Sequence, residues 1–358
     1  GKKSIDKKMA KPLFLVFFQF FLLLLSFFVN QVVDFFYFKE ILLFQFISIF
    51  VSCFLINYAA SRNLFFNDIF EILVFAIFFQ LIISFFGYIN PVFFEYLNLL
   101  FDFGSQDLIS KLYDQRMVGL GAAFFGSGVI NCIILILISS FVVTSNSNKE
   151  KFKFLFYFVS ISILGMLSAR STIIGSILGL LILFLNLKNI KIKIYLIIFI
   201  IFIIFISFFV NFFLKFEDTR VGQLINFTFG VVKEGQDANL VTSVLELLDM
   251  YTLVPESMKT WIIGDGLFRE GFYYYKDTDI GYFRIIYATG LMGLTLYCYT
   301  NLYLIFNIFS ARITLISKLC MAILFFILMA KGVVIFFPII LLLYMASNTT
   351  YFSKLKLI

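Results

Sequence analysis

Three arginines lie directly beside long apolar runs, where a charged side chain is costly. Arg116 precedes the run that begins near residue 120, Arg170 separates two apolar runs, and Arg284 lies near the start of another. A charge near the centre of a membrane helix costs about 2.5 to 3.5 kcal/mol, whereas each charge-assisted hydrogen bond returns about 1.5 to 3 kcal/mol. A guanidinium presents a planar fork of donors that fits phosphate oxygens. Several arginines that converge on one diphosphate would therefore offset the cost of burial.

The segment "GDGLFREGFYYYKDTDIGYFR", residues 264–284, collects glycines, aromatic residues, aspartates and arginines before an apolar run. Asp279, Asp277 and Glu256 are carboxylates of the type that can orient a hydroxyl group and act as a base. We take Asp279, Arg284 and Arg170 as candidate catalytic residues. Further candidates for substrate binding are Gln115, Arg116, Arg269, Tyr274, Asp277 and Tyr282.

Each of these residues also has a structural interpretation. The arginines could anchor at lipid headgroups or pair with neighbouring carboxylates such as Asp114, Asp218 and Asp265. Any one of Asp277, Thr278 and Asp279 would serve as the N-cap of the following helix. That helix would point its positive dipole end towards an anion. Tyr273, Tyr274 and Tyr275 suit either an interfacial aromatic belt or stacking on sugar rings.

The composition defines the kind of molecule that must position these residues. The chain has 358 residues, of which 62% are hydrophobic and 54 are Phe, and its mean hydropathy is +1.02. This is typical of a polytopic membrane protein, and in lipid only helices or closed barrels satisfy the backbone. We expect an all-α transmembrane bundle of about ten spans that forms a single integral membrane domain, residues 1–358.

Charge, cysteine and histidine usage exclude several classes of site. The net charge of +7 comes from lysine clusters beside apolar runs, which are typical of topology signals and not of nucleic-acid binding. All four cysteines fall within apolar segments and the chain has no histidine, so neither a disulfide framework nor a zinc site is predicted. We expect no metal and no cofactor, because arginines alone can stabilise a diphosphate.

Ten apolar runs are candidate membrane spans. The first follows a basic segment and shows no small-residue cleavage site, so we expect it to be retained. The ten runs are Pro12–Val29, Ile41–Tyr58, Ile69–Phe86, Leu120–Val143, Phe152–Leu167, Thr172–Leu187, Ile194–Phe213, Tyr282–Ile308, Ile313–Ala330 and Val333–Met345.

Lysine clusters set the expected orientation. The clusters at residues 2–11, 149–153, 188–193 and 354–356 all fall on one side of this pattern, which the positive-inside rule makes cytoplasmic, together with both termini. Two loops then lie outside, a first outer loop at residues 87–119 and a large one at residues 215–281, the latter partly helical. Most arginines fall on the outer side, opposite to most lysines; they are Arg116, Arg170, Arg220, Arg269 and Arg284.

Small residues mark close helix packing near the arginines. Gly175 and Gly179 have the GxxxG spacing that lets two helix backbones approach. We interpret the glycines of residues 119–128 in the same way, because no strand precedes them as a dinucleotide loop requires. Beyond Gly281, a stripe of Arg284, Ala288 and Thr295 is predicted to face the bundle interior.

Three motifs together resemble one protein family. "GDGLF" followed by "DTDIGYFRIIYATGLMGL" resembles the C-terminal signature of bacterial O-antigen and capsular repeat-unit polymerases of the Wzy type. "LSARSTIIGSILGLL" and "DQRMVGLGAAFFGSG" are similar to the arginine-bearing elements of that family. With the span pattern and the large late outer loop, the resemblance covers essentially the whole chain, and its specificity lies in the order and sidedness of the motifs.

The resemblance implies a GT-C-like glycosyltransferase of the bacterial inner membrane. It would join oligosaccharide repeat units carried on undecaprenyl diphosphate at the periplasmic face, and a chain-length regulator protein is a further candidate partner. Arg116, Arg170 and Arg284 would grip the diphosphate of the donor chain, and Asp279 would lie beside the reacting sugar.

The same arginines and apolar runs also suit other functions. A transporter or flippase for a lipid-linked oligosaccharide would also need cations for a diphosphate, but its site must be reachable from both faces. The related O-antigen ligases use an outer-loop histidine, which this chain lacks. A structural or assembly subunit would not require arginines to cluster on the outer side.

Overall fold

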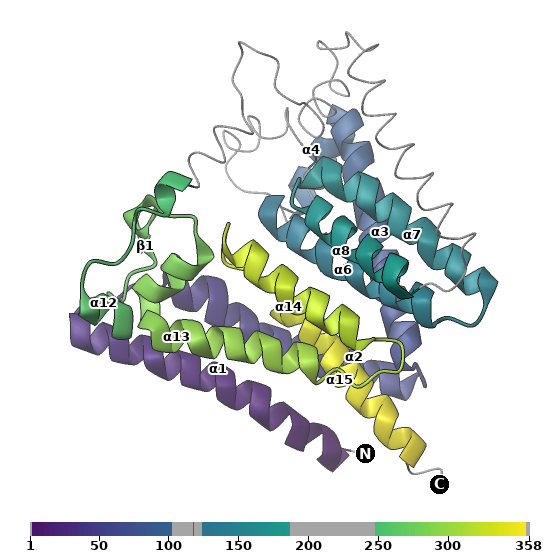
Figure 1. Cartoon of the computed structure of the whole chain (residues 1–358), viewed down its shortest axis with the longest axis horizontal. Helices are drawn as coiled ribbons and strands as arrows, with labels where there is room; N and C mark the ends of the chain where they lie inside the picture. The colour runs from purple at the N-terminus through teal and green to yellow at the C-terminus, as the bar shows by residue number, and fades with distance from the viewer. Residues whose placement is uncertain (1, 102–116, 118–123, 187–247, 272, 356–358) are drawn as a thin grey trace. The chain divides into compact units, whose positions relative to one another are not determined.

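A computed structural model describes residues 2–101, 117, 124–186, 248–271 and 273–355, and the described part is mostly helical (Figure 1). The chain forms two compact units. The first unit comprises Gly1–Glu71, Val241–Ala311 and Met321–Ile358, and the second comprises Ile72–Leu240 and Arg312–Cys320. The two units are described separately below.

The first unit is built around a pair of long helices, α1 and α13. A buried hydrogen bond links them, in which Gln19 Nε2 donates to Thr300 Oγ1 at 2.9 Å, and Figure 1 shows them side by side. A second pair, α2 and α15, also packs within this unit. The elements are α1 (Lys2–Asn30), the π-helix η1 (Phe38–Leu42), α2 (Leu43–Ser61), α12 (Met258–Ile262), β1 (Arg269–Glu270), β2 (Tyr273–Tyr274), the 3-10 helix η2 (Tyr275–Asp277), α13 (Gly281–Phe306) and α15 (Phe337–Leu355).

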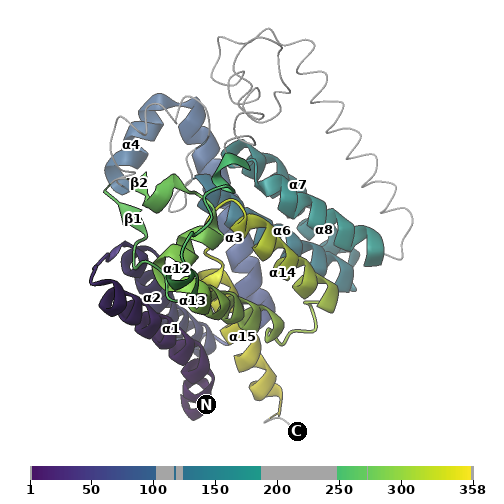
Figure 2. The ribbon, with the colours of Figure 1, turned by 60° about the vertical axis from the view of Figure 1, so that its left-hand side comes forward.

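Helix α13 is kinked at Gly290. This residue has φ +71°, and a Cβ there would overlap the backbone of Ile262 in α12, so both the conformation and the close approach require glycine. The kink interrupts the helical ladder and leaves the Tyr287 carbonyl to accept from the N–H groups of Asp265 at 2.6 Å and Gly266 at 3.1 Å. The turn before β1 is thereby fixed to α13. Figure 2 shows α12 beside α13, with β1 and β2 following it in the chain.

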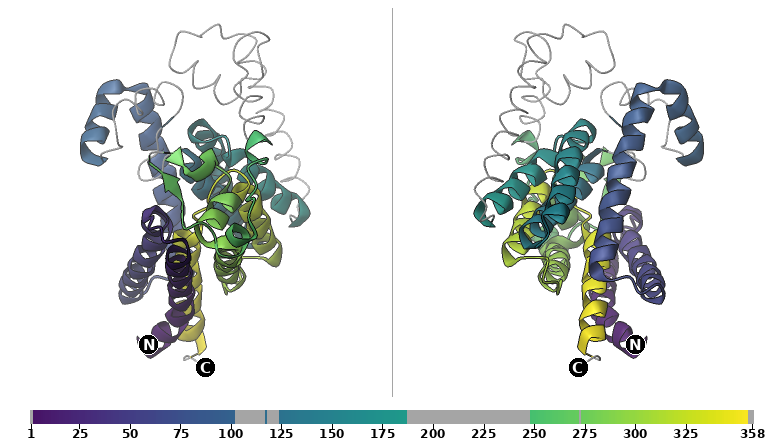
Figure 3. Two further views of the ribbon diagram at one scale, coloured as in Figure 1. Left: turned by 90° about the vertical axis from the view of Figure 1, so that its left-hand side faces the viewer. Right: turned by 90° about the vertical axis from the view of Figure 1, so that its right-hand side faces the viewer.

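The second unit packs around α6. Of its most apolar 18-residue window, 83% is buried, which is far more than in the other candidate spans. In α8, a Cβ at Gly175 would overlap the backbone of Cys132 in α6, so the predicted close approach at the GxxxG pair is confirmed. The helices of this unit are α4 (Pro91–Phe101), α6 (Phe124–Thr144), α7 (Asn148–Ser168) and α8 (Thr172–Asn186), together with most of α3 (Phe66–Ile89) and the start of α14 (Leu315–Met329). Figure 3 draws α6, α7 and α8 in teal and α3 and α4 in blue.

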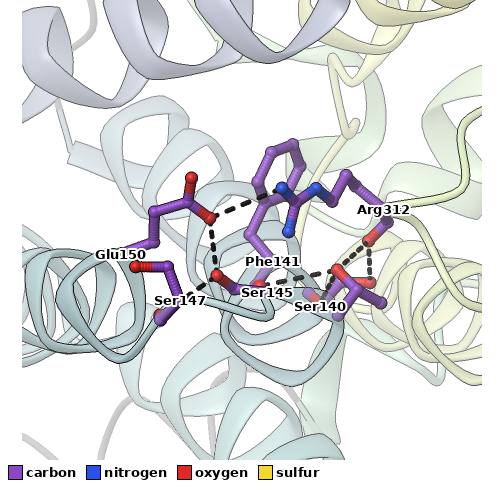
Figure 4. Close-up of polar contacts among 7 residues, drawn as sticks. Ser140, Phe141, Ser145, Ser147, Glu150 and Arg312 are labelled. Carbon is purple, nitrogen blue, oxygen red and sulfur yellow. Dashed lines mark hydrogen bonds and ion pairs between the residues drawn. The ribbon is translucent and has the colours of Figure 1, made fainter.

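A polar network ties the segment at Arg312 to the ends of α6 and α7 (Figure 4). The Ser140 hydroxyl donates to the Arg312 carbonyl at 2.8 Å and accepts from the Thr314 N–H at 3.0 Å. The Arg312 guanidinium lies 3.4 Å from Glu150 Oε2, which also accepts from the Ser145 hydroxyl at 2.5 Å. Backbone groups that have no helical partner are satisfied here by serine hydroxyls.

Nine of the ten predicted apolar runs coincide with helices, and the run at 194–213 lies outside the described residues. Among the helices that the structure describes, five are long and apolar enough to cross a membrane. Helix α13 matches the eighth predicted run in position but is not one of the five. The five are Met9–Asn30, Phe38–Ser61, Phe66–Ile89, Phe125–Thr144 and Asn148–Ser168, and shorter apolar helices are Thr172–Asn186, Leu315–Met329 and Phe337–Asn348. These helices indicate a lipid bilayer as the environment.

Two local expectations were wrong. The N-cap residue of α13 is Ile280, whose N–H donates to the Thr278 hydroxyl at 3.3 Å, and not one of the three polar residues before it. Thr295 is exposed, because the kink at Gly290 rotates the stripe that begins at Arg284. The described part is mostly helical, in agreement with the expected fold class, and it also contains a short antiparallel hairpin, β1 and β2, before α13.

Candidate anion-binding site

Two of the predicted arginines meet on one carboxylate in the first unit. An Arg269 guanidinium NH2 lies 2.6 Å from Glu40 Oε1, and the corresponding nitrogen of Arg284 lies 3.6 Å from Glu40 Oε2. The residues come from three segments, η1, β1 and α13. Glu40 therefore bridges two arginines that are 15 residues apart in the sequence, and both lie more than 200 residues after Glu40.

Asp34 holds the arginine-bearing hairpin against the chain before η1. One oxygen of its carboxylate accepts from the backbone N–H groups of Phe268 at 2.6 Å and Arg269 at 2.9 Å, and the other accepts from the Phe36 N–H at 2.8 Å. Asp34 is buried. Because the contacts with Phe268 and Arg269 join Asp34 to the start of β1, Arg269 is brought to Glu40 by backbone contacts as well as by its own charge.

The hairpin register brings an aromatic ring to both guanidinium groups. Arg269 pairs with Tyr274 across β1 and β2. The Cζ atom of Arg269 lies 5.0 Å from the Tyr274 ring centroid and that of Arg284 lies 3.4 Å from it. Phe268 adds a second ring 4.3 Å from Arg284, and Phe36 one 5.3 Å from Arg269. Guanidinium groups are favourably placed over such faces, more so when desolvated.

The two guanidinium groups keep hydrogen-bonding capacity. Among the described residues, the buried Nε of Arg269 and that of Arg284 have no hydrogen-bond partner. The Arg284 contact with Glu40, at 3.6 Å, is an ion pair longer than a normal hydrogen bond. Since a guanidinium has five N–H donors, this cluster is chemically suited to accept further oxygens from an anion.

In the described part of the chain, the ion pairs of this cluster join two cations to one anion. Two arginines face one glutamate, and the side chain of Arg284 is only 8% exposed. Asp279 lies within electrostatic reach of Arg284 but is itself exposed, and its backbone N–H donates to Met250 Sδ at 3.4 Å. A buried cation in a low-dielectric setting attracts an anion more strongly than a surface cation does.

Other predicted residues of this segment are placed differently. The Tyr282 hydroxyl donates to the Phe326 carbonyl at 2.6 Å and so links α13 to α14. Asp277 is exposed and has a positive φ of +50°. Asp265 accepts from the Thr260 hydroxyl at 2.6 Å, and the carboxylate that pairs with the arginines is Glu40 instead.

The three consecutive tyrosines do not form one stack. Tyr273 is 73% exposed, Tyr274 faces the arginines, and Tyr275 packs edge-on against Tyr287 with ring centroids 5.2 Å apart. Burial raises the pKa of the Tyr275 hydroxyl, and the nearby carboxylates of Asp265 and Glu270 raise it further. The Tyr275 side chain is therefore neutral across the physiological pH range.

Arg170 belongs to the second unit, at the corner between α7 and α8. Partial burial lowers the pKa of its guanidinium, which remains charged at neutral pH. Polar contacts fix this corner: the hydroxyls of Ser127 and Ser168 lie 2.7 Å apart, and Cys132 Sγ donates to the Ser171 carbonyl at 3.1 Å. Gln115 and Arg116 lie outside the described residues, so the predicted convergence of three arginines stays a prediction.

Sequence reasoning missed Glu40 and Asp34. Both lie between the first two apolar runs, on the side where the lysine pattern places the arginines. Two carboxylates in a short segment on the same side as the arginines could have indicated partners for them. Their partners, however, are more than 200 residues away in the chain.

Within the described ranges, no group of three or more His, Cys, Asp or Glu residues is placed to hold a metal ion. Comparison of the chain with known protein families, curated proteins and solved structures finds no match.

Proposed function

We propose that this chain is a Wzy-type polymerase that joins undecaprenyl-diphosphate-linked oligosaccharide repeat units into O-antigen or capsular polysaccharide. In this proposal it is a bundle of about ten spans in the bacterial inner membrane, with both termini in the cytoplasm and the reaction at the periplasmic face. The observation that carries the proposal is the pair Arg269 and Arg284, held together on Glu40 with unused donors. The order of the three sequence motifs supports it.

The reaction needs little from the protein beyond positioning and charge stabilisation. The bond between the anomeric carbon and the diphosphate oxygen of the donor breaks, and its electron pair leaves on the diphosphate. The acceptor hydroxyl oxygen forms the new bond to that carbon and gives up its proton to a base. Arg284 would bind the developing diphosphate charge, with Arg170 and Arg116 as further donors. Asp279, exposed near Arg284, would orient the acceptor hydroxyl and take its proton.

A lipid-linked oligosaccharide transporter or flippase is the second candidate, because it needs the same cations. We favour the polymerase because backbone hydrogen bonds hold the elements that carry both arginines. Asp34 accepts from the hairpin that carries Arg269, and the turn at Asp265–Gly266 donates to α13, which carries Arg284. A rigid site of this kind suits repeated chemistry at one face better than a site that must open to both. Ligase activity is disfavoured, since the chain has no histidine.

The test is polymerisation by the purified protein in liposomes with synthetic undecaprenyl-diphosphate repeat units, followed as a ladder of products. Arg284→Lys and Arg170→Lys keep the charge and remove the fork, and each is expected to slow the ladder by about a hundredfold. Arg62→Lys is the control, because Arg62 is exposed and also lies over a tyrosine ring, that of Tyr58, at 5.6 Å.

Two results would count against the polymerase. A ladder that persists in both folded variants would remove the arginines from the mechanism. If the wild type produces no ladder from several authentic repeat units, yet moves the lipid across the liposome membrane, the transporter would replace the polymerase.

A further inference from the structure

Glu40 occupies the position that an anionic ligand of the arginine pair would take. Each of its two carboxylate oxygens faces a different guanidinium, at 2.6 Å from Arg269 and 3.6 Å from Arg284. A guanidinium recognises carboxylate and phosphate oxygens through the same planar arrangement of donors. Glu40 and a phosphate group would therefore compete for the same N–H groups.

Of the three charged side chains, Glu40 is the one whose environment permits it to leave. Arg284 is buried against Phe268 and Tyr274, and the backbone of Arg269 is fixed by Asp34. The side chain of Glu40 is 28% exposed and lies on η1, a single π-helical turn. Water can therefore solvate a displaced Glu40 carboxylate, whereas Arg284, at 8% exposure, has little access to water and needs a counter-ion.

The charges of the competing groups determine which ligands succeed. A phosphodiester headgroup carries one negative charge, the same as the glutamate that is already tethered in place. A diphosphate ester carries at least two charges and more acceptor oxygens, so it can satisfy both arginines and the unused Nε donors together. In a membrane made largely of phosphodiester lipids, a tethered carboxylate would thus exclude the abundant headgroups.

We propose that Glu40 is a built-in counter-ion that sets the specificity of the site: a diphosphate ester displaces it from Arg269 and Arg284, and a monoanionic phosphodiester does not. The inference rests on the proposed function, since it takes the arginine pair as a diphosphate site. It adds the residue that decides which lipid phosphate enters.

The test is calorimetric titration of the full chain in a phosphate-free detergent. The probes are farnesyl diphosphate, inorganic diphosphate and dihexanoyl phosphatidylglycerol. Inorganic diphosphate separates recognition of the phosphates from binding of a prenyl chain, and phosphatidylglycerol represents the bulk lipid. The wild type is expected to bind both diphosphates at least tenfold more tightly than phosphatidylglycerol.

Glu40→Gln removes the competing charge and nearly preserves the shape of the side chain. We expect it to tighten phosphatidylglycerol binding by about tenfold, the effect of losing roughly one charge-assisted contact, and to narrow the preference for diphosphate. Glu270→Gln is the matched control. Glu270 is exposed and adjacent to Arg269, so the substitution removes one negative charge beside the arginine pair without touching the ion pairs, and affinities should change less than twofold.

The outcomes separate this inference from the function on which it rests. If Glu40→Gln weakens binding of all three probes, Glu40 is a scaffold and the counter-ion inference is wrong, while the diphosphate site stands. If neither the wild type nor Glu40→Gln binds either diphosphate, the proposed function fails. If phosphatidylglycerol binds the wild type as tightly as the diphosphates do, the specificity assigned to Glu40 fails.

A second variant covers the case in which Glu40→Gln does not fold. Glu40→Asp keeps the charge but shortens the side chain by one methylene, which draws the carboxylate back from both arginines. Phosphatidylglycerol should bind this variant more tightly than the wild type. Equal or weaker binding would overturn the inference.

Discussion

Aromatic rings, more than carboxylates, define the surroundings of Arg284. Its Cζ atom lies 3.4 Å from the Tyr274 ring centroid and 4.3 Å from that of Phe268. Both distances are well below about 6 Å, the usual upper limit for a cation–π contact. Its ion pair with Glu40 is long. The rings hold the guanidinium plane without using its N–H donors, which leaves those donors for a ligand.

Substitution of Tyr274 tests this role of the ring. Tyr274→Leu removes the aromatic face and is expected to weaken farnesyl diphosphate binding by about three- to tenfold, in line with about 0.5 to 2 kcal/mol for a cation–π contact. Tyr274→Phe keeps the face and should bind within twofold of the wild type. Tyr273→Leu controls for loss of a tyrosine from the hairpin, because Tyr273 is largely exposed. Equal losses in the Leu and Phe variants would assign the effect to the hydroxyl instead.

Beyond these residues, the candidate site depends on how short elements are attached to long helices. Strands β1 and β2 contain two residues each and cannot be stable alone. Two attachments hold them. The Asp34 carboxylate accepts from the backbone N–H groups of Phe268 and Arg269. The N–H groups of Asp265 and Gly266 donate to the Tyr287 carbonyl, which the kink in α13 leaves available. The position of Arg269 is thus set by backbone hydrogen bonds made by its neighbours.

Loss of the Asp34 attachment should loosen the hairpin. Asp34→Ala removes both acceptor oxygens and leaves the backbone N–H groups of Phe268 and Arg269 without their acceptor, at a cost of about 1 to 3 kcal/mol for a buried N–H. We expect a lower thermal midpoint in detergent and faster hydrogen exchange at the amides of Phe268 and Arg269. Asp68→Ala is the control, because Asp68 accepts from the Phe65 N–H at 2.7 Å in an exposed setting. Unchanged exchange at Phe268 and Arg269 would show that the hairpin is held by other contacts.

At the scale of the whole molecule, the sequence was informative about helices and poor about what joins them. Apolar runs predicted nine described helices, since run length and composition are local properties. The Glu40 bridge and the Asp34 contacts connect residues more than 200 positions apart, and no local pattern encodes them. The N-cap expectation failed for a related reason: the packing of the turn before α13 places Ile280, not a polar residue, at the cap. Arg284 was predictable because a charge beside an apolar run is conspicuous by itself.

The sidedness of the membrane protein is a further whole-molecule prediction, and it follows from the lysine clusters. In a background with the four native cysteines replaced by serine, Asp277→Cys lies in an exposed turn before α13 and Lys149→Cys in the exposed first turn of α7. A membrane-impermeant maleimide added to spheroplasts should label Asp277→Cys at once and Lys149→Cys only after permeabilisation. The physical reason is that lysine-rich loops resist translocation, which leaves the arginine-bearing segment on the opposite side of the membrane. The reverse pattern would place Arg269 and Arg284 in the cytoplasm, where a periplasmic polymerase has no use for them.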